Sequence, residues 1–213
     1  MKSSRALALI MLAALAAAAG AQARRAPRSP DRDDDFRAIL GAALQDADVV
    51  VTSGGVSMGA YDTVKAVLSQ SGRVEFVKVA QHPGMPQGCG RVGEREVPIV
   101  TLPGNPVSSF VSFELYVRPL IRRLLGRSDL VRPLEPAVCE EPVVSPAGKQ
   151  QYLRGVLTVG RDGSRSVRPV GGQGSHVVGA LARANSLIVV PVGVGTVQAG
   201  ETVSVIDLDR SAP

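Results

Sequence analysis

DVVVTSGGVSMGAYD, residues 48–62, is the stretch of sequence that decides the fold. It opens on a β-branched run over residues 48–52, which predicts a short strand buried on both faces, as in a parallel sheet. The run SGGVSMG, residues 53–59, predicts a loop whose glycines let the backbone approach a ligand closely. Helical spacing of apolar residues follows over residues 63–70. Strand, glycine-rich loop and helix in this order are typical of the carboxyl edge of an α/β sheet, where ligands bind.

The neighbouring segments extend this pattern into an α/β layered domain. Apolar spacing predicts a helix over residues 36–44 and strands over residues 74–79 and 97–102. Strands joined through helices in this way are typical of layered α/β domains.

A second loop, LPGNP, follows the last of these strands. Asn105 is a good N-cap and Pro106 suits the first helical position, so a helix is expected to begin there. It should run to about residue 125, with Gly126 as its stop. Pro119 lies inside this helix and should kink it or mark its last turns.

The amino-acid composition changes near residue 133. Residues 133–213 are rich in Val, Gly and turn residues, with short strand-like runs at residues 155–159, 166–170, 187–190 and 202–206. This spacing predicts a small all-β barrel domain or a sandwich. The predicted organisation is therefore an N-terminal helix and linker over residues 1–35, an α/β domain over 36–132, and a β-barrel domain over 133–213.

Charge and composition exclude several classes of partner. The 213 residues carry 24 basic and 19 acidic side chains, and seven of the basic ones fall within residues 1–37. The remainder is therefore close to neutral and predicts no nucleic-acid-binding face. Aromatic residues make up only 3%, so surfaces for base stacking are scarce. Two distant cysteines, Cys89 and Cys139, predict reduced thiols in a cytoplasmic protein and no structural zinc site.

The N-terminus has the pattern of a secretory signal. Lys2 and Arg5 precede an apolar run over residues 6–19, which is followed by a cleavage-like Ala-Gln-Ala. The same run also fits an Ala/Leu-rich buried helix that ends at Gly20, and it is too short to predict a membrane span. Residues 24–35 carry prolines and many charges, which predict a loop or disordered linker.

The first candidate site follows the 48–52 strand. Consecutive amides in the 53–59 loop can cradle an anion, and a carboxylate at Asp62 could hold a magnesium ion. An ordinary tight turn with a solvated aspartate explains this loop equally well.

The second candidate site is the LPGNPVSS loop, residues 102–109. Asn105, Ser108 and Ser109 could bind phosphate groups, although helix capping alone explains them. Lys78 could pair with an anion or simply point to solvent. In the β-rich part, Arg154 and Ser175 have the chemistry to bind an oxyanion.

Taken together and in order, these segments resemble one family. DVVVTSGGVSMGAYDTVKAVL, FVKVAQHPGMPQGCG and IVTLPGNPVSSFVSFELYVRPLIRRLLG are similar to the catalytic domain of molybdopterin molybdotransferases, the family of MoeA and the gephyrin E domain. YLRGVL, QGSHVVGALARANSLIVVP and AGETVSVIDL are similar to its C-terminal β-barrel domain. The resemblance covers about residues 36–208. It implies a three-layer α/β/α domain like the molybdopterin-binding fold, followed by a small all-β barrel domain.

The resemblance implies a reaction and a set of site residues. The family transfers molybdate to adenylylated molybdopterin, with Mg²⁺, giving molybdenum cofactor and AMP, and its full-length members are expected to be cytoplasmic homodimers. It implies catalytic roles for Asp62, also the metal ligand, and for Lys65 and Lys78. It implies substrate-binding roles for a further set: Gly54, Gly55, Ser57, Gly59, Pro103, Gly104, Asn105, Pro106, Ser108, Arg154 and Ser175.

The chain departs from the family pattern in two ways. His82 and Met85 stand where some relatives carry lysines, so the anion site is expected to be less basic. Two N-terminal domains and the strands that flank a helix like residues 6–20 are also absent. We therefore expect residues 6–20 to be that family helix in a shortened chain, and the N-terminus not to be a signal.

Three alternative interpretations stay open. Molybdopterin adenylyltransferases and competence-damage-type proteins share the α/β domain, but the β-rich tail disfavours them. A truncated homologue could bind pterin or a partner without turnover. A secreted β-rich binding protein is the third.

Overall fold

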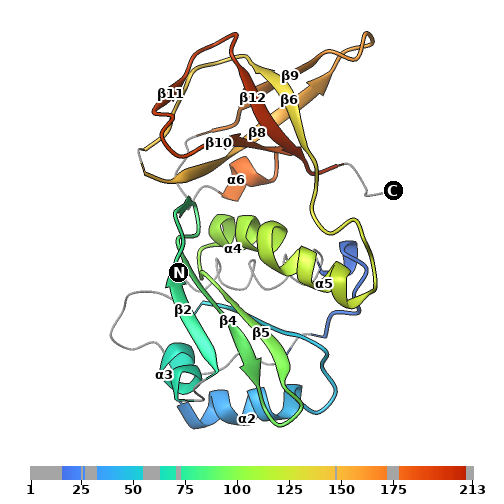
Figure 1. The fold of residues 1–213 in the computed structure, drawn as a ribbon, viewed down its shortest axis with the longest axis vertical. Helices are drawn as coiled ribbons and strands as arrows, with labels where there is room; N and C mark the ends of the chain where they lie inside the picture. Colours follow the sequence, from blue (N-terminus) through green and yellow to red (C-terminus); the bar gives the residue numbers. More distant parts are fainter. Residues whose placement is uncertain are drawn as a thin grey trace. The chain divides into compact units, whose positions relative to one another are not determined.

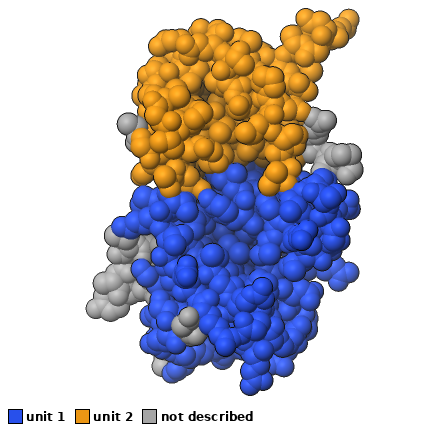
Figure 2. Space-filling view, viewed as in Figure 1, with its two compact units in different colours: residues 1–79, 84–130 blue, residues 80–83, 131–213 orange. Residues whose placement is uncertain are grey.

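The structure is a computed structural model. The chain forms two compact units, residues 1–79 with 84–130 and residues 80–83 with 131–213 (Figure 2). The structure describes residues 16–24, 26, 33–54, 63–70, 73–146, 148–171 and 178–209.

The first unit is built on a four-stranded sheet in the order β1-β5-β4-β2. Figure 1 labels three of these strands, β5, β4 and β2. β1 (Val50–Ser53) pairs in parallel with β5 (Val97–Leu102), and β4 (Pro86–Val92) runs antiparallel to both β5 and β2 (Val74–Lys78). β1, β5 and β2 therefore run the same way, and their carboxyl ends share one edge of the sheet.

Helices cover both faces of this sheet, which confirms the predicted three-layer arrangement (Figure 1). On one face, which we call the α3 side, α2 (Asp33–Ala43) and α3 (Thr63–Ser69) pack on Ile99 and Val74. The other face, the α4 side, is covered by α4 (Pro106–Ser112), η1 (Phe113–Val117) and α5 (Arg118–Leu124). Burial of these apolar side chains on both faces stabilises the unit.

The described N-terminal residues join this core. Residues 16–18 are helical and the turn ends at Gly20, whose φ is +97°, as predicted for the helix stop. Ala19 is buried and belongs to the cluster of Leu102 and Phe113 on the α4 side.

The prediction of a loop over residues 24–35 is wrong at its end, because α2 already begins at Asp33. Its first turn holds Asp33, Asp34 and Asp35, which are favoured there by the partial positive charge of a helix N-terminus. Their charge, which suggested a solvated linker, is a helix-start signal.

β4 was not predicted from the sequence, since Pro86, Gly88 and Gly90 argue against a strand. The structure explains both glycines by crowding. A Cβ on Gly88 would lie 2.2 Å from Thr101 Oγ1, and one on Gly90 would lie 2.0 Å from the Arg73 carbonyl oxygen. The glycines are there because neighbouring strands leave no room for a side chain.

The helix after the second loop begins and ends as predicted. Asn105 caps α4, and Gly126, with φ +73°, follows the end of α5. Between α4 and α5 lies the π-helical turn η1, just before Pro119. Proline has no N–H and crowds the preceding turn, so the wider turn replaces the expected kink.

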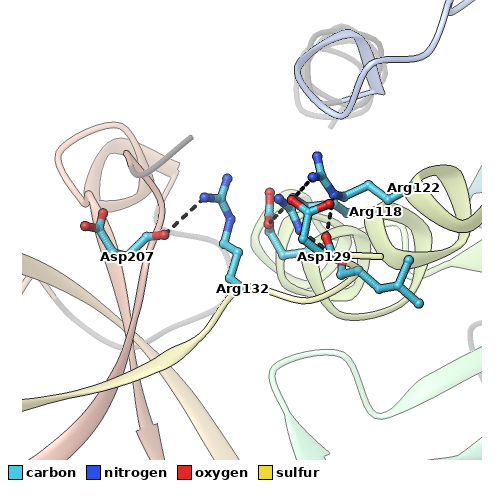
Figure 3. A network of polar contacts seen from close by, with 7 residues as sticks. Arg118, Arg122, Asp129, Arg132 and Asp207 are labelled. Atoms are coloured by element: carbon cyan, nitrogen blue, oxygen red, sulfur yellow. Dashed lines mark hydrogen bonds and ion pairs between the residues drawn. The ribbon is translucent and has the colours of Figure 1, made fainter. Parts of the chain in front are cut away.

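Two buried arginines fasten the segment that follows α5 (Figure 3). Arg122 Nε donates to the Asp129 carbonyl at 2.7 Å, and its guanidinium pairs with the Asp129 carboxylate. Arg118 donates to the Leu130 carbonyl at 3.1 Å and lies 3.9 Å from the Glu114 carboxylate. Charged hydrogen bonds of this kind in a low-dielectric site hold the end of the unit in one conformation.

The second unit is a small barrel, as predicted. Its strands pair around a ring in the order β10-β12-β6-β9-β8, which closes through β10 and β8, and β3 adds to β8. The ring strands are β6 (Leu134–Cys139), β8 (Gln150–Val159), β9 (Arg165–Pro169), β10 (Ser186–Val190) and β12 (Thr202–Asp207). The remaining elements are β3 (Gln81–His82), β7 (Val143–Val144), β11 (Thr196–Val197) and α6 (Val178–Leu181).

Alternating aliphatic side chains fill the barrel. Leu153, Val167, Ile188 and Val205 belong to one buried cluster. Within this unit Arg132 donates to the Asp207 carbonyl at 3.1 Å, which ties the start of β6 to the end of β12 (Figure 3). Both cysteines are free, as expected.

Candidate functional site

The two predicted loops meet at the carboxyl edge of the first unit's sheet. Gly54 follows β1 with φ +91°, and its N–H donates to the Leu102 carbonyl at the end of β5 at 2.9 Å. A Cβ on Gly104 would lie 3.3 Å from the Cα of Gly54. The chain therefore crosses itself here through two glycines, which have no side chains to keep a ligand from the backbone at the ligand-binding edge of an α/β sheet.

On the α4 side of this edge, the polar side chains bond to the protein itself. The Asn105 side-chain oxygen accepts from the N–H groups of Val107 at 3.1 Å and Ser108 at 3.5 Å. Ser109 Oγ donates to the Pro103 carbonyl. Because a hydroxyl has one proton, Ser53 Oγ is then the donor in its 3.4 Å contact with Ser109 Oγ.

The α3 side of the same edge carries different groups. Thr52 and Thr101 are register partners at the ends of β1 and β5. Lys78 ends β2 and is exposed. Lys65, on α3, places its amine 5.7 Å from the centroid of the Phe76 ring on β2. The two lysines that the sequence singled out thus lie on elements of the α3 side.

Several predicted site residues lie outside the described residues. They are Gly55, Ser57, Gly59, Asp62 and Ser175. Among the residues that the structure does describe, no three His, Cys, Asp or Glu side chains cluster closely enough to hold a metal ion. A magnesium site that rests on described side chains alone is therefore not assembled here.

Arg154 lies in the barrel unit, on β8 opposite Leu187 of β10. Its side chain is buried, with 2% of the residue exposed. Burial lowers the pKa of the Arg154 guanidinium, but arginine stays protonated at neutral pH. A buried cation interacts strongly with an oxyanion, because the local dielectric is low.

His82 and Met85, the positions at which the resemblance predicted a less basic anion site, lie in different units. His82 Nδ1 bonds Gln151 Oε1 at 2.9 Å within the barrel unit, whereas the Met85 carbonyl accepts from the Val79 N–H in the first unit. Sequence reasoning did not single out Gln151. Nothing local marks it, because a strand pairing between distant segments brings it to His82.

Sequence reasoning also passed over the two threonines. The signal was available, because each of two apolar runs, VVV and IV, ends in a threonine just before a glycine-containing loop.

Among the described residues, no helix is both long and apolar enough to cross a membrane.

Comparison with known proteins identifies this architecture. Residues 8–123 match the family described as "Probable molybdopterin binding domain", and residues 136–208 match "MoeA C-terminal region (domain IV)". The two units thus define a molybdopterin-binding α/β fold followed by the barrel region of MoeA proteins.

Relatives of known name agree with this class. Molybdopterin molybdenumtransferase 2 of Mycobacterium tuberculosis is 44% identical over 205 residues, which cover 93% of this chain and 49% of the relative. Molybdopterin molybdenumtransferase of Haemophilus influenzae is 38% identical over 177 residues, which cover 83% and 43%. The chain therefore belongs to the molybdopterin molybdotransferase (MoeA) family, and it spans about half the length of the curated relatives it matches.

Solved structures show the same fold. A molybdenum cofactor biosynthesis protein from Pyrococcus furiosus is 28% identical with a TM-score of 0.71, over 93% of this chain and 63% of that one. The MoeA protein of Pyrococcus horikoshii, at 21% identity, has a TM-score of 0.73 over 93% of this chain and 45% of that one.

Proposed function

We propose that this chain carries the catalytic and barrel domains of a molybdopterin molybdotransferase, which inserts molybdate into adenylylated molybdopterin and gives molybdenum cofactor and AMP. The observation that carries the proposal is the Gly54–Gly104 crossing, with Lys65 and Lys78 on one side of the same edge. Two anionic substrates need close backbone approach and fixed cations, and this edge offers both.

The proposed roles follow from chemistry and position. The loop groups Gly54, Gly55, Ser57, Gly59, Pro103, Gly104, Asn105, Pro106 and Ser108 bind the pterin and its phosphates. Lys65 and Lys78 stabilise negative charge on the reacting groups. Arg154 and Ser175 bind the molybdate oxyanion.

Magnesium enters this proposal as a substrate-linked ion. Asp62 would hold Mg²⁺ together with phosphate oxygens of the substrate, since this ion is commonly bound by one or two carboxylates plus phosphates. When bound, it supplies polarisation of the phosphoryl group. The residues of this chain position and neutralise the substrates around it.

We further propose a cytoplasmic protein that acts on small molecules, dimerises with a second copy, and binds neither nucleic acid nor membrane. The domain division after about residue 132 is part of the same proposal. A second candidate is a pterin-binding homologue without turnover.

Calorimetry with adenylylated molybdopterin and Mg²⁺, followed by an assay of AMP release with molybdate, tests the proposal. We expect Asp62→Ala and Lys78→Ala to weaken binding or abolish AMP release. Lys149→Ala, on a turn of the barrel unit, is the matched control and should behave as the wild type. Binding without AMP release would identify the non-catalytic homologue, and a folded chain without binding would exclude both candidates.

A further inference from the structure

Thr52 and Thr101 form a pair of hydroxyls on the α3 side of the sheet. They are register partners in the parallel pairing of β1 with β5. Val50 and Ile99, two residues earlier on each strand, pack in the cluster formed with α2 and α3. Since side chains alternate along a strand, both threonines point to that same face, on strands about 4.8 Å apart.

Both hydroxyls are buried without a partner. Thr52 Oγ1 and Thr101 Oγ1 are shielded from solvent, and neither has a hydrogen-bond partner in the part of the chain that the structure describes. Thr101 as a whole is 0% exposed. A buried hydroxyl left unpaired destabilises a fold, so two in adjacent register positions, where valine would fit, call for a reason other than stability.

Two cations lie on the same face of the sheet as this pair. The next residue across the sheet is Gly88, and the Thr101 hydroxyl and the Phe76 ring already fill the space above it, since a Cβ there would lie 2.2 Å from Thr101 Oγ1 and 2.9 Å from the Phe76 ring. Beyond it, Phe76 carries the Lys65 amine over its ring. Lys78, two residues after Phe76, lies on the same face by strand alternation. Two donor hydroxyls and two cations therefore occupy one side of one sheet edge.

We propose that Thr52 and Thr101 are substrate-contacting residues, whose hydroxyls donate hydrogen bonds to an oxyanion group of the bound substrate. The proposal rests on the proposed function and extends its site by two residues. Phosphate and molybdate are both tetrahedral oxyanions, which a pair of hydroxyls of this kind can bind. The oxyanion that the threonines contact is therefore either a phosphate group of the pterin substrate or molybdate. The hydroxyls act as hydrogen-bond donors and take no covalent part in the reaction.

The test uses Thr52→Val and Thr101→Val in the full chain, with Thr158→Val, at an exposed position near the end of β8, as the matched control. Valine keeps the β-branched shape and removes only the hydroxyl. Melting temperature and calorimetric affinity are measured for each variant, with inorganic phosphate, molybdate and adenylylated molybdopterin as separate probes. We expect each Val variant to melt at the wild-type temperature or above. We expect the affinity for at least one probe to fall about tenfold per hydroxyl, the usual effect of a hydrogen bond to a charged group.

Two results would overturn the proposal. A clear fall in melting temperature would mean that the hydroxyls serve the fold, and unchanged affinity in both Val variants would mean that they do not touch the ligand. If affinity is unchanged in both Val variants but the wild type binds adenylylated molybdopterin, the threonine proposal is wrong and the proposed function is still supported. Binding of phosphate or molybdate alone, weakened in both variants, supports the threonine pair while removing the proposed pterin substrate. No binding of any probe by the folded wild type removes both proposals.

Discussion

The two sides of one sheet edge use similar residues differently. On the α4 side Ser53, Ser109 and Asn105 bond to the protein's own backbone or to each other. On the α3 side the hydroxyls of Thr52 and Thr101 have no partner among the described residues. Strand-end hydroxyls one residue apart in β1 thus belong to opposite environments, because successive side chains point to opposite faces.

This difference separates groups that stabilise the fold from groups available to a ligand. A capping asparagine satisfies helix N–H groups that would otherwise lack a bond. An unpaired hydroxyl contributes nothing comparable, and functional sites are where proteins tolerate such departures from good packing. Substitutions on the α4 side should therefore lower stability, and hydroxyl removal on the α3 side should lower ligand binding.

The largest expected effect is that of Gly88→Ala, which adds a Cβ where Thr101 and Phe76 leave no room. Its new Cβ would crowd Thr101 Oγ1 and the Phe76 ring, and overpacking of this kind costs about 1–3 kcal/mol. Chemical denaturation of Gly88→Ala, Thr101→Ala and the double variant would measure it. The double variant should recover part of the loss, because the two sites share one space. Additive losses would contradict this account of the α3 side.

On the α4 side, Asn105→Ala should destabilise the protein by about 1 kcal/mol, because α4 loses its N-cap. Urea denaturation would measure the loss. Asn105→Asp is the matched control, since an aspartate also caps a helix and should retain most of the stability. Equal losses in both variants would show that Asn105 does more than cap α4.

Lys65→Met should have a smaller effect on stability, about 0.5 kcal/mol, because an exposed cation over an aromatic ring contributes little. A double-mutant cycle with Phe76→Leu isolates that contact. If the ligand uses the Lys65 amine, affinity for an oxyanion should fall well beyond what this stability change explains. A coupling near zero would show that the Phe76 ring does not hold the amine in place.

Lys78→Met should have the smallest effect on stability, within about 0.5 kcal/mol, because Lys78 is exposed at a strand end. Its effect should appear only in calorimetric titration with adenylylated molybdopterin, as a loss of affinity. Added salt should weaken binding by the wild type, and so reduce the difference in affinity between the wild type and Lys78→Met. A large stability loss would place Lys78 with the structural residues of the α4 side.

Much of the fold could be predicted, and the failures have identifiable physical causes. The periodicities that predict α3, β5 and the barrel strands β8, β10 and β12 are local, because each strand or helix buries its own apolar face. β4 was missed because its glycines are required by close contact with Thr101 and Arg73, which are distant in sequence. α2 was predicted three residues short because acidic residues mark both linkers and helix starts.

The candidate site divides in the same way. Sequence alone determined the two loops, the Asn105 cap and the candidate lysines, since turn, cap and charge signals act over a few residues. Only the tertiary structure decided that Gly54 crosses Gly104, that Thr52 pairs with Thr101, and that the serines face the opposite side. Strand register sets these relations between residues about fifty positions apart, and no local pattern carries that information.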